Sequence, residues 1–127
     1  MGQKILIADD EAHIRLLLKR TLEDLEDEDV EIITANDGAQ ALDKISTERP
    51  NLVFLDVMMP IINGFDVCHA IKRQMGLQNI HIIMLTAKGQ EFDKQKGKEV
   101  GADSYITKPF DPDQIYDEAI EVLGLEG

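Results

Sequence analysis

The chain has 127 residues, with no tryptophan and a single cysteine, Cys68. One cysteine cannot form an internal disulfide, which is typical of proteins that work in a reducing compartment. No apolar run approaches the ~20 residues that a membrane-spanning helix needs. Residues 1–4 run straight into an apolar pattern, so we expect no signal peptide, and Leu6 stands where a myristoylation signal has Ser or Thr. These absences exclude a disulfide scaffold and predict a single soluble, cytoplasmic domain with no membrane partner.

Basic residues are missing from two acidic segments. Residues 21–31 carry seven acidic side chains and residues 111–127 carry six, and neither segment has a Lys or Arg. The rest of the chain has 13 basic and 12 acidic residues, so these two segments account for the net charge of −12. Such segments are usually solvated helix faces, and they repel a phosphate backbone. The sequence therefore predicts no direct binding to nucleic acid.

Five short apolar runs alternate with segments of helical periodicity. Three of the runs are almost continuously apolar, as strands buried on both faces are, and two are more polar, as edge strands are. The predicted strands are 4–8, 31–35, 52–56, 80–86 and 104–108. Apolar side chains recur at helical spacing from Ile14 to Leu25, from Phe65 to Met75 and from Ile115 to Leu123.

The remaining helices are predicted from their ends. Asn36-Asp37-Gly38 opens one helix, and Asp111-Pro112 supplies an N-cap followed by proline at the first helical position. The helix expected over 88–100 is weak, because it holds two glycines and has few apolar anchors. We expect this segment to be among the first to move.

The alternation of strands and helices predicts an α/β fold with a parallel sheet covered on both faces. The most apolar strands are the first, third and fourth, so the second and fifth are expected at the edges. This favours the flavodoxin-like (βα)5 three-layer sandwich with strand order 2-1-3-4-5. We assign 3–124 to this domain and 125–127 to a C-terminal tail, which would also fit a cloning remnant.

Polar side chains gather where the predicted strands end. Asp9 and Asp10 follow the first strand, and Asp56, Thr86 and Lys108 end the third, fourth and fifth. The carboxyl ends of parallel strands meet at one edge, where such sheets bind ligands. Three carboxylates this close repel one another, and a hard divalent cation such as Mg²⁺ relieves that repulsion. The ammonium and the hydroxyl complement a phosphoryl group.

Together, these residues resemble the receiver domain of two-component response regulators, and the single-domain chemotaxis type in particular. The resemblance covers residues 3–124 and rests on four segments in order. They are Ile-Leu-Ile-Ala-Asp9-Asp10-Glu11, Leu-Asp56-Val-Met-Met-Pro60 with Gly64, Leu-Thr86-Ala87, and Gly-Ala-Asp-Ser-Tyr105-Ile-Thr-Lys108-Pro109-Phe110. Each segment alone is a weak signal, whereas their joint placement at four strand ends is specific.

The resemblance implies a nucleophile and a metal site. Asp56 would take a phosphoryl group from a phosphohistidine and hold it as an acyl phosphate. Asp10, Asp56 and the backbone carbonyl of Met58 would bind Mg²⁺ directly, with Asp9 reaching it through water. Such a domain catalyses only its own phosphorylation and dephosphorylation, so we do not expect an enzyme with an external substrate.

The resemblance also implies phosphoryl contacts and a switch. Lys108, Thr86 and the N–H of Ala87 would contact phosphoryl oxygens. Tyr105 would turn inward as the Thr86 hydroxyl moves toward the phosphate, and Lys108-Pro109 would be a cis peptide. Partners would be a histidine kinase or a histidine phosphotransfer protein, and a downstream protein or output domain contacted through the fourth helix, fifth strand and fifth helix. The fifth helix lacks basic residues used in one class of receiver dimers, which favours a monomer or weak dimer.

Several of these residues also allow a different role. Asp9 or Asp10 can cap the first helix, and Tyr105 can be a plain edge-strand residue. A phosphohydrolase with an aspartyl nucleophile is disfavoured, because its second acid would stand at Met58. An interaction module that works without phosphorylation usually lacks one of the key groups, all of which are present here. The three histidines are expected at or near the surface, and Cys68 in the core. Met58 and Lys88 flank the expected path of an attacking water and predict a long-lived acyl phosphate.

Overall fold

The structure is a computed structural model that describes residues 2–87 and 91–125, without side-chain detail at 91–94. Five strands form one parallel sheet in the order β2-β1-β3-β4-β5, as predicted. The strands are β1 (Gln3–Ala8), β2 (Val30–Ala35), β3 (Leu52–Asp56), β4 (His81–Ala87) and β5 (Ser104–Lys108). Each lies within one residue of its predicted bounds, because buried parallel strands read as continuous apolar runs.

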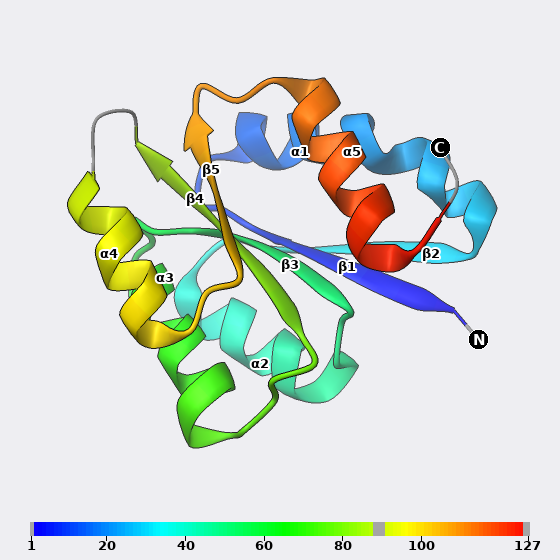
Figure 1. The fold of residues 1–127 in the computed structure, drawn as a ribbon. Coiled ribbons are helices and arrows are strands. Elements are labelled where there is room, and N and C mark those ends of the chain that lie inside the picture. Colours follow the sequence, from blue (N-terminus) through cyan, green and yellow to red (C-terminus); the bar gives the residue numbers. More distant parts are fainter. Residues whose placement is uncertain (1, 88–90, 126–127) are drawn as a thin grey trace.

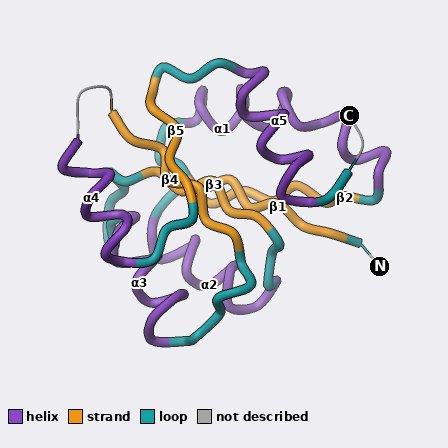
Figure 2. The backbone as a smooth tube through the Cα atoms, in the orientation of Figure 1, coloured by secondary structure: helices purple, strands orange, loops and turns teal. Residues whose placement is uncertain are grey.

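Helices cover both faces of the sheet (Figure 1). On one face, α1 (Ala12–Leu22) packs against α5 (Pro112–Leu123). On the other face lie α2 (Gly38–Glu48), α3 (Gly64–His69) and α4 (Glu91–Val100). Two separate apolar cores result, one on each side of the sheet. Because the five strands are parallel, their carboxyl ends lie along one edge of the sheet, and Figure 2 shows this sheet between its two layers of helices.

The predicted helix starts are confirmed by their caps. The Asp37 side chain accepts a hydrogen bond from the Gln40 N–H, and the Asp111 side chain accepts one from the Asp113 N–H. Proline follows Asp111 at the start of α5, where its missing N–H costs nothing. Asp9 and Asp10 do not serve as the N-cap of α1, because that residue is Glu11.

Two helical stripes end differently from their prediction. After Leu22 the chain tightens into a 3-10 helix, η1 (Glu23–Glu28), which carries most of the first acidic segment. After His69 it widens into a π-helical turn, η2 (Ala70–Gln74), closed by a Met75 N–H bond to the Ala70 carbonyl of 2.8 Å.

Because of this π turn, the last residue of a predicted apolar stripe is not buried, contrary to the prediction. The extra residue in this turn rotates the residues after it relative to a regular helix. Cys68 and Ile71 are fully buried, as the stripe predicts, whereas Met75 is 40 % exposed. Within α1, Leu17 is similarly 41 % exposed, although it is one of the helically spaced apolar residues between Ile14 and Leu25 that were predicted to face the core.

None of the helices within the described ranges 2–87 and 91–125 is long and apolar enough to cross a membrane.

Candidate functional site

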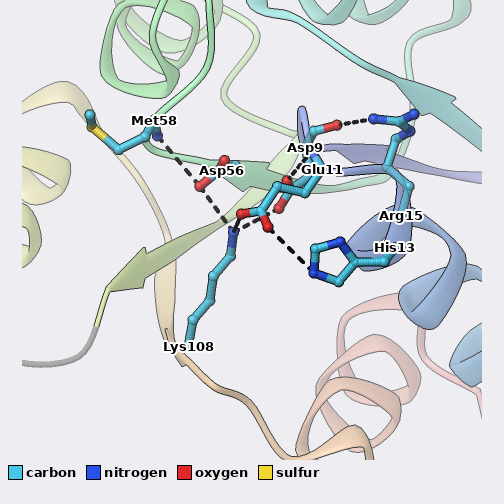
Figure 3. A network of polar contacts seen from close by, with 7 residues as sticks. All are labelled: Asp9, Glu11, His13, Arg15, Asp56, Met58 and Lys108. Carbon is cyan, nitrogen blue, oxygen red and sulfur yellow. Dashed lines mark hydrogen bonds and ion pairs between the residues drawn. The ribbon is translucent and has the colours of Figure 1, made fainter.

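The predicted site residues of β1, β3 and β5 meet at one edge of the sheet (Figure 3). The ammonium of Lys108 lies 2.8 Å from Asp9 Oδ2 and 3.3 Å from Asp56 Oδ1. Asp9 is fully buried and Asp56 is 5 % exposed. Residues 9, 56 and 108 are far apart in the sequence, so only the parallel sheet brings their charges into contact.

Asp9 is held by the backbone around it. Its Oδ1 accepts a hydrogen bond of 2.9 Å from the Glu11 N–H, and its backbone carbonyl accepts one of 2.7 Å from the Arg15 guanidinium. Its own N–H donates to the Ala35 carbonyl of β2 at 3.2 Å. Asp9 therefore stabilises the turn into α1 and also presents its second carboxylate oxygen to Lys108.

The donor set fits a hard divalent cation. Asp9, Asp10 and Asp56 each offer a carboxylate oxygen, and these atoms lie within 4.8 Å of one another. Asp10 is exposed, whereas the other two are buried. Grouped carboxylates with solvent on one side suit Mg²⁺, which binds oxygen ligands and keeps several waters. Met58 donates its N–H to Asp56 Oδ1 at 3.4 Å, and its carbonyl as a metal ligand stays a prediction.

Burial and like charge make Asp56 hard to ionise without a metal. Burial, followed by the negative charge of Asp9, raises the pKa of Asp56 to about 7, although Lys108 acts in the opposite direction. Burial also opposes the charge of Lys108, but its hydrogen bond to Asp9 and the charge of Asp56 outweigh burial and raise the Lys108 pKa. The ammonium therefore stays protonated and is the cation that two carboxylates share.

A cleft of about 280 Å³ opens beside Asp56. Its lining includes Asp10, Met58, Ala87 and Lys108. Ala87 is exposed at the end of β4. The side chain of Thr86, one residue earlier, is buried, and its hydroxyl has no hydrogen-bond partner among the residues that the structure describes. An unpaired buried hydroxyl is costly unless something else satisfies it.

The loop after β3 is fitted closely to Asp56. At the start of α3, Gly64 donates its N–H to the Val57 carbonyl at 2.9 Å. A Cβ at Gly64 would come within 2.2 Å of the Asp56 carbonyl oxygen, so any larger residue would displace the backbone at the end of β3. The Asn63 side chain then caps α3 by accepting from the Asp66 N–H. Gly64 is thus required for the geometry of the site.

The predicted switch residues lie on β5. Lys108-Pro109 is a cis peptide, as predicted. The side chain of Tyr105 packs against the core on the α4 side of the sheet, and its hydroxyl is buried with no partner in the described part of the chain. Burial raises the pKa of Tyr105. This placement differs from that of an ordinary outward-facing edge residue.

Other predicted residues fall outside the cluster. His13 is exposed and lies 3.4 Å from Glu11 Oε2, while His69 is exposed and His81 half-buried. Cys68 is buried, as predicted, and burial raises the pKa of its thiol to about 12. Lys88 lies outside the described residues.

Sequence reasoning missed two features. Lys72 is buried and forms an ion pair with Asp103 at 2.8 Å, although lysine at that position reads as a surface residue. Ile61 adopts φ 73°, which a β-branched side chain rarely does. No sequence signal predicts this conformation, because position 61 holds neither the Gly nor the Asn that adopts it readily.

Comparison with known proteins gives a consistent picture. A family model described as the response regulator receiver domain matches residues 5–120. The chain is 47 % identical over 115 residues to the alkaline phosphatase synthesis transcriptional regulatory protein PhoP of Bacillus subtilis, covering 91 % of this chain but only 46 % of PhoP. It is 41 % identical to protein PilG of Pseudomonas aeruginosa, covering 90 % of this chain and 82 % of PilG. The solved structure of the chemotaxis response regulator CheY4 of Vibrio cholerae matches with a TM-score of 0.82 and 34 % identity, covering 96 % of this chain and 99 % of CheY4.

Proposed function

The chain belongs to the response regulator receiver domain family, and from this premise we propose that Asp56 is its phosphoacceptor. One carboxylate oxygen of Asp56 would attack the phosphorus of a phosphohistidine, the bond from phosphorus to the imidazole nitrogen would break, and the imidazole would leave. The product is an aspartyl phosphate. Its formation is the input to a conformational switch.

The shared ammonium of Lys108 carries this proposal. Lys108 contacts Asp56 directly and is held by the buried Asp9. A phosphoryl group on Asp56 would place oxygens beside this ammonium, and a charge-assisted hydrogen bond would stabilise them. The unpaired Thr86 hydroxyl is a second donor at the end of the neighbouring strand, and the N–H of Ala87 would be a third.

We propose Mg²⁺ as the cofactor, held by Asp10 and Asp56 with the Met58 carbonyl, and by Asp9 through water. When bound, Mg²⁺ would offset the charge of the carboxylates and of the transferring phosphoryl group. Lys108 would orient the phosphoryl group, and its charge favours the ionised form of Asp56 that attacks. Met58, at 75 % exposure, can neither accept nor donate a proton, so Met58 would not help a water to hydrolyse the aspartyl phosphate.

Receiver domains of response regulators interact with histidine kinases and with output domains. For this chain we propose a phosphohistidine donor at the Asp56 cleft and an output partner on α4, β5 and α5. The acidic α5, with no basic residue, supports a protein partner rather than direct nucleic-acid contact. A cytoplasmic location and the absence of an external substrate are part of the same proposal. A hydrolase is disfavoured, because the second acid of such an enzyme would stand two residues after Asp56, where this chain has Met58.

The proposal is tested by phosphoryl transfer from acetyl phosphate. With Mg²⁺, the protein is expected to gain the mass of one phosphoryl group, and EDTA should prevent the gain. Asp56→Asn should take up none, whereas Asp66→Asn, which changes an exposed aspartate in the first turn of α3, should react like the parent. Equal uptake by Asp56→Asn would overturn the assignment of the phosphoacceptor.

A separate prediction concerns the loop between β3 and α3. The Ile62 N–H donates to the Pro60 carbonyl at 2.9 Å, which makes Ile61 the centre of a tight turn with φ 73° and a side chain 77 % exposed. Ile61→Asn should therefore stabilise the protein by about 0.5–1 kcal/mol, because asparagine tolerates this conformation and little apolar burial is lost. Urea unfolding measures the change. Ile62→Asn, at a half-buried neighbour, should destabilise the protein, and a loss for both variants would show that Ile61 is not strained.

A further inference from the structure

The ring of Tyr105 lies against α4 at a glycine. Gly97 is buried in the middle of that helix. A Cβ built on Gly97 would lie 2.6 Å from Tyr105 Cε1 and 3.5 Å from both Cδ1 and Cζ. The first of these distances is too short for two carbon atoms. Tyr105 can occupy its present position only because residue 97 has no side chain.

The helix cannot easily retreat from the ring. The Gly97 carbonyl accepts a hydrogen bond of 2.9 Å from the Ala102 N–H, which closes the end of α4. Val100 is buried, and its carbonyl lies 3.6 Å from the Cys68 Sγ of α3. Figure 2 shows α3 and α4 side by side. Because this end of α4 is tied to α3, a side chain at residue 97 would be accommodated by movement of the ring.

An ion pair between the buried Lys72 and the exposed Asp103 holds the strand on the other side of this contact. Asp103, directly before β5, pairs with the buried Lys72 and also accepts from the Ile82 N–H at 2.8 Å. The backbone leading to Tyr105 is therefore anchored to both η2 and β4. With the helix end and the strand start both anchored, rotation of the Tyr105 side chain is the remaining way to relieve a clash.

The sheet register connects this contact to the phosphorylation site. Tyr105 pairs with Met84, and Thr107 pairs with Thr86. Side chains two residues apart in a strand share a face, so Thr86 lies on the same side of β4 as the buried Met84 and on the same side of the sheet as Tyr105. The hydroxyls of Thr86 and Tyr105 are both buried without a hydrogen-bond partner in the described ranges. The ring and the Thr86 hydroxyl thus belong to one packed layer.

From these contacts we infer that Gly97 is a positioning residue for Tyr105. The missing side chain at Gly97 leaves the space that the Tyr105 ring occupies, and this space sets how far the ring turns inward. Glycine is a poor helix former, so its place in the middle of α4 is explained by the ring rather than by the helix. Any side chain at position 97 would turn Tyr105 outward and uncouple α4 from Asp56. The inferred coupling between α4 and Asp56 rests on the proposed function, whereas the contact between Gly97 and Tyr105 does not.

A thermal double-mutant cycle tests the contact. Gly97→Ala improves helix propensity but displaces the ring in the parent, so the melting temperature should fall. In a Tyr105→Ala background the clash is absent, and the same change should raise the melting temperature. Lys98→Ala, at the exposed neighbour, should shift the melting temperature equally in both backgrounds. An equal shift for Gly97→Ala in both backgrounds, or a larger gain in the parent, would overturn the inference.

Fluorotyrosine labelling then follows the ring. The chain has two tyrosines, so Tyr116→Phe leaves a single fluorine signal from Tyr105. Beryllofluoride, which mimics the aspartyl phosphate, should move this signal in the parent. In Gly97→Ala, the fluorine chemical shift without beryllofluoride should already be that of a solvent-exposed ring, and beryllofluoride should change it much less than in the parent. Asp56 of this variant should still take up a phosphoryl group from acetyl phosphate. A full shift in Gly97→Ala would refute the coupling. Failure of the parent to take up a phosphoryl group would refute the proposed function. The thermal double-mutant cycle would still test the contact between Gly97 and Tyr105 by itself.

Discussion

Asp56→Asn is expected to stabilise the metal-free protein by about 2–4 kcal/mol at pH 8, measured by urea unfolding in EDTA. The pKa of Asp56 in the folded protein is about 7, raised by burial and by Asp9. In the unfolded chain the same carboxyl titrates near its ordinary value of 3.8. Ionising this buried group therefore opposes folding, and asparagine removes that cost while keeping the size of the side chain.

The sign of the pKa shift predicts a pH window for this gain. Below about pH 4 the carboxyl is protonated in both states, so the charge adds nothing to the difference between parent and variant. Between about pH 4 and 7 only the unfolded chain releases the proton, so the gain grows with pH. Above about pH 7 the gain is constant.

Two controls make this prediction specific. Asp66→Asn, at an exposed position, should show no such window. Mg²⁺ should stabilise the parent by mass action more than Asp56→Asn, because the variant has lost a charged ligand. The difference in free energy of unfolding between the two proteins should therefore be smaller in Mg²⁺ than in EDTA. A gain that is the same at pH 4 and pH 8 would mean that burial of the Asp56 charge is not its cause.

Lys108→Met is expected to destabilise the metal-free protein by about 2–4 kcal/mol at neutral pH, because it leaves the buried Asp9 carboxylate without its cation and makes Asp56 still harder to ionise. Asp9 is fully buried, and its Oδ2 lies 2.8 Å from the ammonium. Asp56 loses the same partner at 3.3 Å. Methionine keeps most of the apolar length of the side chain, so the loss reports mainly on charge. Urea unfolding in EDTA measures this loss.

Lys4→Met is the matched control. Lys4 forms a salt bridge of 2.7 Å with Glu48, but both side chains are substantially exposed, and exposed pairs contribute little. The loss for Lys4→Met should therefore be much smaller. Mg²⁺ should restore part of the stability of Lys108→Met and leave Lys4→Met unchanged, because only the first variant exposes uncompensated carboxylates at the metal site. Equal losses for the two variants would show that the Lys108 contacts add little to stability.

The strand order and most of the site could be predicted from the sequence. A strand buried on both faces must be apolar along its whole length. The runs 4–8, 52–56 and 80–86 are more apolar than the other two, which places these three strands in the centre of the sheet. Once the order is known, the carboxyl ends of β1, β3, β4 and β5 must share one edge. Asp9, Asp56, Thr86 and Lys108 follow from that geometry without any side-chain coordinates.

The sequence by itself thus determined the strands, their order and the polar residues at the strand ends, since these follow from the apolar pattern of each short segment and from the geometry of a parallel sheet. Only the tertiary structure decided the features that depend on close packing between distant segments. The π turn after His69 exposes Met75, and Lys72 reaches Asp103 across the fold. The absence of a Cβ at Gly97 matters only because Tyr105 packs there. A glycine or a lysine reads alike on a surface and in a core, so its role is decided by the partner that packing brings against it.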